Sequence, residues 1–222
     1  MRAHMKHLPS IITLTLLALL VAAPSFALPI TPVSYDMKNG GTGVYHYWDD
    51  SYNGSGSTST NYAQLSGGHG DLTDGIIATK NYDSYYPVSP GPYVGWYNMN
   101  PIITFHFGSV IDLSSLTLFL DNFHSNLVYL PSSVTLSMGG TTLTYSIYDG
   151  NTATPIAATF SNLNLFGDTL TMTLNSQKSN EWTFLSEVEF DGTNVVPEPA
   201  TILLVGPVLL GLAGYTWRRK FA

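Results

Sequence analysis

Three glutamates near the end of the chain, Glu181, Glu187 and Glu189, are the carboxylates best placed for catalysis. Hydrolysis of a glycosidic bond needs two carboxyl groups about 5 to 9 Å apart across a cleft. Glu187 and Glu189 share one face of an expected strand, where both can simply be solvated, and no second motif pairs with them. A secreted polysaccharide-processing enzyme, a glycoside hydrolase or lyase using Glu181 or Glu187, is therefore the alternative function, and a non-enzyme is favoured.

The histidines offer little further chemistry. Those beyond the first 27 residues show no His-x-x-x-His spacing of a zinc site, and no Gly-x-Ser-x-Gly elbow is present. His69 and Asp71, within Gly-Gly-His-Gly-Asp, are the one local pair with catalytic potential. A glycine-rich turn explains the same two residues.

Aromatic residues are concentrated in the first half of the chain. The set comprises Tyr45, Tyr47, Trp48, Tyr52, Tyr82, Tyr85, Tyr86, Tyr93, Trp96 and Tyr97. Sugars pack their C–H faces on flat rings that keep a wet polar edge. Tyr85, Tyr86, Tyr93 and Trp96 are therefore the expected ligand-binding residues. The alternative is that these rings belong to the core and to strand faces, where Tyr and Trp are favoured, and this alternative applies more strongly to Trp182.

Charge and cysteine content exclude several functions. Residues 28–196 carry three basic and 14 acidic residues, a net charge of 3 − 14 = −11, whereas the whole chain has −7. Such a surface repels nucleic acid, so no nucleic-acid partner is expected. The chain has no cysteine, which excludes disulfides, a cysteine nucleophile and thiolate metal sites.

Short stretches of alternating apolar and polar residues predict the fold. Ile103, Phe105 and Phe107 alternate with Thr104 and His106, which is the period of a strand with one buried face. Turn-forming residues such as Gly139-Gly140 and Gly167-Asp168 separate further expected strands. Those strands are residues 116–120, 134–138, 142–148, 156–160, 169–174 and 182–190. The pattern predicts an all-β domain, an antiparallel β-sandwich of the jelly-roll type.

The N-terminus has the pattern of a secretory signal peptide. Arg2 and Lys6 precede an apolar run over residues 11–21, and small residues lead to an expected signal peptidase cleavage between Ala27 and Leu28. The run is too short for a membrane anchor. The expected division is residues 1–27 as signal peptide, 28–196 as exported domain and 197–222 as a sorting tail.

The C-terminus has three elements in order. Pro197-Glu198-Pro199 precedes an uncharged apolar segment of 18 residues, 200–217, and the basic residues Arg218, Arg219 and Lys220 follow. The segment is long enough for a transmembrane helix, and the basic end places the domain outside the cytoplasm. This tail resembles the PEP-CTERM sorting signal of exopolysaccharide-producing Gram-negative bacteria. The resemblance implies an exosortase partner, an inner-membrane intermediate and delivery to the cell surface or extracellular matrix.

The exported domain resembles the galactose-binding-like jelly roll of discoidin-type and carbohydrate-binding modules. The residues that carry the resemblance are Leu72-Thr73-Asp74-Gly75, Thr79, Gly95-Trp96, residues 103–108, and residues 182–190 with Ser186-Glu187-Val188. His106 departs from the family pattern, which has an acidic or neutral polar residue there. No cluster of basic and aromatic ligand residues is evident at the matching loops.

The resemblance also implies a structural Ca²⁺ ion. The matching positions are Asp74 and Glu187, with Asp71 nearby, and carboxylates beside a glycine-containing loop are ligands that Ca²⁺ accepts. The alternative is that Asp71 and Asp74 cap a turn through bonds to backbone amides. Together, the sequence predicts a structural or adhesive matrix protein of a biofilm that interacts with exopolysaccharide.

Overall fold

The computed structural model describes residues 27–85, 91–150, 153–177 and 179–195. The predicted signal sequence up to residue 26, Tyr86 and the whole sorting tail lie outside these ranges. Within them, no helix is long and apolar enough to cross a membrane. The elements in these ranges are β1 (Leu28–Pro29), β2 (Ser34–Lys38), β3 (Gln64–Gly68), η1 (Tyr82–Tyr85), β4 (Val94–Tyr97), β5 (Ile102–Leu120), η2 (His124–Asn126), β6 (Ser133–Met138), β7 (Thr141–Ser146), β8 (Ile156–Asn175) and β9 (Trp182–Asn194).

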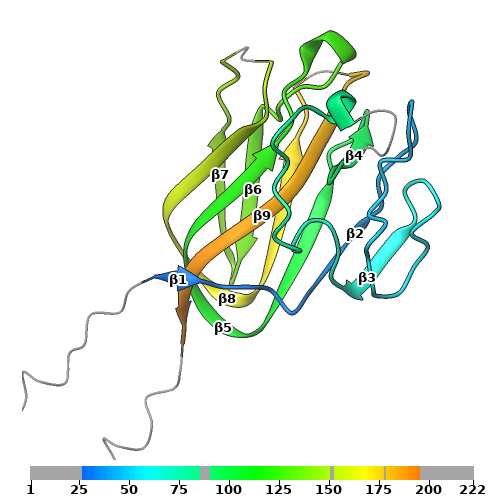
Figure 1. Ribbon diagram of the computed structural model, residues 1–222. Coiled ribbons are helices and arrows are strands. Elements are labelled where there is room, and N and C mark those ends of the chain that lie inside the picture. The colour runs from blue at the N-terminus through cyan, green and yellow to red at the C-terminus, as the bar shows by residue number, and fades with distance from the viewer. Residues whose placement is uncertain (1–26, 86–90, 151–152, 178, 196–222) are drawn as a thin grey trace, which may run out of the picture.

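Two long strands, β5 and β8, join two layers into one sandwich (Figure 1). The first part of β5 pairs with β2 and with the end of β8, which in turn pairs with β6 and β6 with β7. The second part of β5 pairs with β9 and with the start of β8, and β9 also pairs with β1 and β4. All these pairings are antiparallel, which confirms the predicted antiparallel all-β sandwich.

The strand boundaries differ from the prediction at the bends. Residues 103–107 and 116–120 were expected as two strands but belong to one, β5, and the two predicted strands of β8 are likewise continuous. The β5–β8 register shifts between His106 and Ile111, and Gly108 within this step has a φ of +70°. A bulge with glycine lets a strand bend without breaking. The glycines near residues 108 and 167 therefore mark bends inside strands.

The main core lies between the layers. Ile103, Phe105 and Phe107 of β5 are buried, as their alternation predicted, and they pack in one cluster with buried residues of β2, β6, β8 and β9. A second, smaller cluster is formed by Tyr47, Ala78, Tyr82, Tyr93, Val128 and Phe184. The second cluster lies beside β4 and the start of β9, and it supports the candidate site described below.

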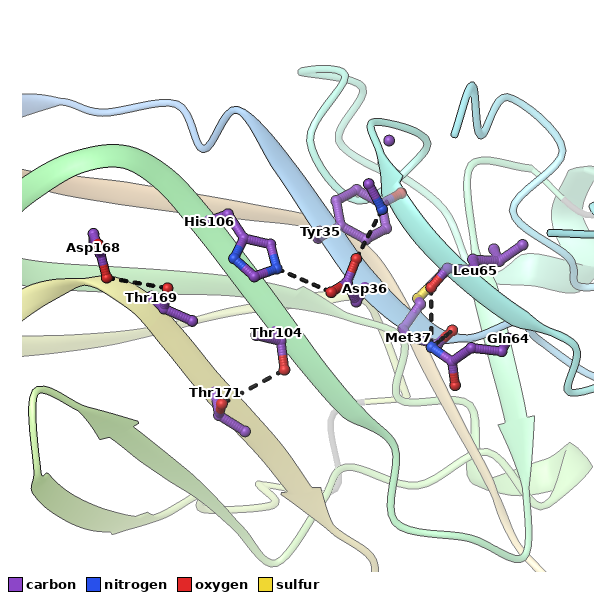
Figure 2. Close-up of polar contacts among 12 residues, drawn as sticks. Tyr35, Asp36, Met37, Gln64, Leu65, Thr104, His106, Asp168, Thr169 and Thr171 are labelled. Carbon is purple, nitrogen blue, oxygen red and sulfur yellow. Dashed lines mark hydrogen bonds and ion pairs between the residues drawn. The ribbon is translucent and has the colours of Figure 1, made fainter. Parts of the chain in front are cut away.

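His106 lies on the outer face of β5 and pairs with the neighbouring strand. Its Nε2 atom is 3.0 Å from Asp36 Oδ2 on β2, and Asp36 Oδ1 accepts a 2.8 Å bond from the Gly67 backbone N–H of β3 (Figure 2). Asp36 therefore links three strands at the rim of the sandwich. The departure from the family pattern at position 106 has a structural role here.

Candidate functional site

The strongest candidate site is an open hollow of about 510 Å³ beside the second aromatic cluster. Its lining comes from the loop after β2, from η1, from η2 and its cap, and from the first residue of β9. We call it the aromatic hollow, and its lining residues are Gly43, Val44, Tyr47, Tyr82, Ser125, Asn126, Leu127 and Trp182.

Trp182 is the half-buried ring of this hollow. Its centroid lies 5.1 Å from that of Tyr47 in an edge-to-face arrangement and 5.5 Å from that of Phe184 in a stacked one. Backbone bonds hold the residue from both sides, since Trp182 N–H donates to Leu127 O at 2.8 Å and Tyr129 N–H donates to Trp182 O at 3.0 Å. The backbone bonds hold the main chain of Trp182, and the ring packs against Tyr47 and Phe184.

Gly43 allows the loop after β2 to approach this ring. A Cβ atom at position 43 would lie 2.9 Å from Trp182 Cζ2 and 3.0 Å from Tyr47 Cε2, closer than van der Waals contact permits. Any larger residue would have to displace one of the two rings. The glycine thus keeps the loop close to the ring without covering it by a side chain.

The hollow has a polar side. Ser125 and Asn126 are exposed on η2, and the Asn126 side chain bonds to the Tyr82 hydroxyl. Burial, and secondarily the nearby Tyr82 hydroxyl, raises the pKa of Tyr47 to about 12. Both tyrosine hydroxyls therefore stay protonated at neutral pH. The arrangement offers the half-buried Trp182 ring on one side and neutral hydrogen-bonding groups on the other.

The aromatic residues predicted to bind a ligand lie mostly elsewhere. Tyr93 is 1 % exposed and Trp96 is 0 % exposed. Tyr93 donates its hydroxyl to Lys80 O, and Trp96 Nε1 donates to Lys38 O at 2.8 Å. Stacking on a sugar needs an open ring face, so both residues are reassigned to the core. Tyr85 is half-buried, and its hydroxyl accepts a bond from the Thr79 backbone N–H.

A second group of functional candidates, the carboxylates, surrounds the turn at residues 70–76. Asp49, in the loop after β2, is fully buried and bonds to this turn. Its Oδ1 accepts from the Asp71 backbone N–H at 2.9 Å, and its Oδ2 accepts from the Tyr35 hydroxyl. Burial, and then the charge of Asp71, raises the pKa of Asp49 to about 7. No sequence motif marks Asp49, because a buried carboxylate has no motif of its own.

The three predicted Ca²⁺ ligands lie around the same turn. Glu187 is 3 % exposed, and its Oε2 accepts from the Gly75 N–H at 2.9 Å. Asp74 Oδ1 accepts from the Ile76 N–H at 2.8 Å, and Asp71 Oδ1 accepts from the Ser51 hydroxyl. Burial, and to a smaller extent the charge of Asp74, raises the pKa of Glu187 to about 7. We call Asp49, Asp71, Asp74 and Glu187 the carboxylate cluster.

The cluster does not have the arrangement of a metal centre. In the described ranges, no three His, Asp or Glu side chains converge in a group that could hold a metal ion. Each of the three predicted ligands has an oxygen bonded to a backbone N–H or a hydroxyl of the protein itself. This arrangement fits the capping alternative, and Ca²⁺ binding stays a prediction of the family resemblance.

Of the three glutamates named for catalysis, Glu181 lies apart, whereas Glu187 and Glu189 line one pocket of about 390 Å³. Glu181 is 2 % exposed and accepts from the Gln177 N–H at 2.6 Å. It stands just before β9, so six residues at roughly 3.3 Å each separate it from Glu187 by about 20 Å. Glu189 is exposed whereas Glu187 is buried. The spacing of about 5 to 9 Å that glycoside hydrolysis needs is absent between Glu181 and Glu187.

Sequence reasoning missed most of the hollow. The sequence favours a core position for Trp182, which shares a strand with Phe184, and Gly43, Ser125 and Asn126 carry no motif. One feature of the sequence does point to Trp182: it directly follows the polar stretch of residues 175–181. A tryptophan at the first residue of a strand lies next to the preceding loop and can be partly exposed there.

Comparison with known proteins supports the fold. Residues 32–192 match the family described as discoidin domain-containing receptor 1/2, DS-like domain. No curated protein matches the sequence significantly. Similar solved structures include the CBM32 of AlyQ in complex with 4,5-unsaturated mannuronic acid (14 % identity, 73 % of this chain and 97 % of that chain, TM-score 0.44). A Streptococcus pneumoniae fucose binding module is also similar (11 % identity, 76 % and 98 %, TM-score 0.45).

A truncated AlyQ with CBM32 and alginate lyase domains is similar as well, at 12 % identity and a TM-score of 0.45. The match covers 78 % of this chain but only 35 % of that chain.

Proposed function

We propose, from the premise that this chain belongs to the discoidin domain-containing receptor 1/2 DS-like domain family, that it is an exported, non-catalytic protein that binds a glycan in the aromatic hollow. The observation that carries the proposal is the half-buried Trp182 ring beside neutral polar groups of η2. An apolar surface with a few placed hydrogen-bonding groups is the usual composition of a small-ligand site.

The chemistry of the hollow suits a neutral sugar. The C–H face of a pyranose ring packs on the indole, while Ser125 and Asn126 can exchange hydrogen bonds with its hydroxyls. The hollow has a volume of about 510 Å³, within the range of about 300 to 1,000 Å³ that small-molecule pockets span. Among the described residues that line it there is no carboxylate pair of the kind that glycoside hydrolysis uses, and the lining groups suit binding.

Export and sorting complete the proposal. The predicted signal peptide and the Pro197-Glu198-Pro199 tail support secretion, exosortase processing and a final place at the cell surface or in the matrix, where exopolysaccharide is the available glycan. The intact mass of the mature protein tests this part. We expect a product that begins at Leu28 and ends near residue 197, and a product that keeps residues 200–222 contradicts exosortase processing.

A glycan array tests the binding itself. We expect the mature protein to bind one class of neutral glycan, Trp182→Ala to lose that signal, and Gly43→Ala to weaken it by pressing a methyl group against the ring. Tyr148→Ala is the matched control, because Tyr148 is an aromatic residue that is 89 % exposed outside the hollow. Equal signals from the wild type and Trp182→Ala, with both proteins folded, would exclude the hollow as the site.

A further inference from the structure

The outer face of β6 and β7 carries hydroxyl groups at every outward position. Inward residues of β6, such as Val134 and Leu136, are fully buried in the core. The outward positions of the two strands are occupied by Ser133, Thr135, Ser137, Thr142, Thr144 and Ser146. No charged side chain interrupts this part of the surface.

The same pattern continues across β8 and into β5. Thr169, Thr171 and Thr173 point outward from β8, and Thr104 does so from β5. The register aligns Ser137 with Thr142, Thr171 with Ser137 and Thr104 with Thr171, so one row of hydroxyls runs across four strands. A second row, Thr144, Thr135 and Thr173, runs across three. Figure 2 shows the Thr104–Thr171 step of one row, with the two Oγ1 atoms 3.5 Å apart.

Neighbouring hydroxyls in these rows bond to one another. The Oγ1 atoms of Thr135 and Thr144 are 3.1 Å apart, as are Ser137 Oγ and Thr142 Oγ1. Within a row, hydroxyls on neighbouring strands are about 4.8 Å apart, and successive rows are about 6.7 Å apart along the strands. The result is a regular, neutral array of groups that both donate and accept hydrogen bonds. We call it the hydroxyl face.

The composition of the domain does not explain why this face is neutral. On the other layer, the outward residues of β5 and β9 include Asp112, Glu189 and Asp191. The domain as a whole has a net charge of −11, counted as three basic and 14 acidic residues. Threonine is favoured in strands in general, but that preference applies to both layers. On this layer, the outward positions of β6, β7 and residues 169–173 of β8 carry no charge, and the charged residues Asp36 and Lys38 begin at β2.

A groove of about 300 Å³ adjoins the hydroxyl face at β2 and β5. Asp36, Lys38, Gln64, Asn100 and Thr104 contribute hydrogen-bonding groups to it, and the exposed Ile102 contributes an apolar surface. Gln64 is held in place, because its Nε2 donates to the backbone oxygens of Met37 and Leu65 at 3.0 Å each (Figure 2). The groove thus combines fixed polar groups with one apolar contact.

We infer that the hydroxyl face and its groove form a second glycan-binding surface, whose occupant is an extended neutral polysaccharide. This inference goes beyond the proposed function, which concerns the hollow, and stands on different residues. An anionic polymer would be repelled by the acidic domain, whereas a neutral one is not, and it meets no charged residue on β6, β7 and residues 169–173 of β8. Each hydroxyl contact is worth little in water, so only a long chain that makes many of them is held.

The aromatic hollow and the hydroxyl face would let the protein bind matrix polysaccharide at two separate sites. The hollow accepts a single sugar residue, and the face accepts a stretch of chain. A protein with both can bridge two polymers, which is the property that a matrix component needs.

Affinity electrophoresis of the mature protein in gels with soluble neutral polysaccharides (dextran, galactomannan and mixed-linkage β-glucan) tests the inference, and alginate serves as the anionic counterpart. The test variant is Thr104→Glu with Thr171→Glu. The matched control is Thr117→Glu with Thr159→Glu, because this pair also joins β5 to β8 through hydroxyls, 3.0 Å apart, but lies on the other layer. Thermal melts of both variants establish that they fold.

We expect at least one neutral polysaccharide to retard the wild type, the test variant to bind it at least tenfold more weakly, and the control variant to stay within twofold of the wild type. Alginate is expected to retard none of them. Equal loss in both variants, no loss in the test variant, or no retardation by any neutral polymer would overturn the inference. So would a wild-type dimer that the test variant dissociates, since the face would then bind a second copy.

Trp182→Ala separates this result from the proposed function. We expect it to lose the glycan-array signal and to keep its retardation in the gels. If it keeps the array signal while the test variant still loses retardation, the proposed function of the hollow fails and the hydroxyl face stands.

Discussion

The aromatic hollow and the carboxylate cluster both rest on strand β9, one at Trp182 and the other at Glu187. In the cluster, the carboxylate oxygens accept bonds from N–H and O–H groups of the protein itself, notably from Gly75, Asp71 and Tyr35. In the hollow, a ring and the side chains of η2 face an open space. Residue type therefore does not separate a structural site from a binding site. What separates them is whether the fold already satisfies the functional groups.

The largest effect that this comparison predicts is on stability. Asp49→Ala removes an acceptor from the Tyr35 hydroxyl and from the Asp71 N–H, both beside a fully buried side chain. Unpaired buried polar groups cost roughly 1 to 3 kcal/mol each, so we expect a loss of about 2 to 4 kcal/mol in the free energy of unfolding. Urea denaturation measures this loss. A loss below about 0.5 kcal/mol would show that the cluster does not hold the turn.

The pH dependence of the melting temperature tests whether the buried carboxyl groups of the cluster contribute to stability. The pKa values of Asp49 and Glu187 are about 7 in the folded protein, above the usual 3.8 and 4.5, mainly because both are buried. The folded state therefore binds protons more tightly than the unfolded one, and stability from these groups falls as pH rises from about 4 to about 7. We expect the melting temperature to drop by several degrees between pH 5 and pH 8. Asp49→Asn should flatten this slope, and a melting temperature that rises over this range would contradict the assignment.

A smaller effect is expected for Glu187→Gln. The glutamine oxygen can still accept the Gly75 N–H bond, so unfolding should change by less than about 1 kcal/mol. Glycan binding should be unaffected. Cleavage of a polysaccharide releases reducing ends. When the wild type or the variant is incubated with exopolysaccharide, we expect no such release. Release that this substitution abolishes would instead establish the polysaccharide-processing enzyme.

The smallest expected effect concerns Ca²⁺. Because Asp74 and Glu187 already accept bonds from backbone N–H groups of the turn, we expect the melting temperature in calcium to lie within about 1 °C of that in chelator. A calcium-dependent rise that Asp74→Ala removes would instead establish the ion that the family resemblance implies.

The sequence was informative about the fold and less so about the site. The alternation at Ile103, Phe105 and Phe107 depends only on local periodicity, so it predicted the buried face of β5 correctly. The bend at Gly108 depends on the register with β8, which no local pattern contains. Burial of Trp96 likewise depends on contacts between distant segments, since its nitrogen bonds to Lys38 O.

The same limit explains the exchange of roles among the aromatic residues. Trp96 and Trp182 lie on paired strands, β4 and β9, and each is flanked by strand-forming residues. One lies against the core, whereas the other lies at the end of its strand beside Gly43 and η2. Only the fold places the loop after β2 and the η2 turn on either side of Trp182.

Glycan binding in the aromatic hollow can be tested by calorimetric titration of the mature protein with the neutral glycan selected on the array, comparing the wild type, Trp182→Ala and Glu187→Gln. We expect Trp182→Ala to weaken binding at least tenfold, about 1.4 kcal/mol, and Glu187→Gln to bind like the wild type. If Glu187→Gln loses binding and Trp182→Ala keeps it, the glycan binds at the carboxylate cluster and not in the hollow.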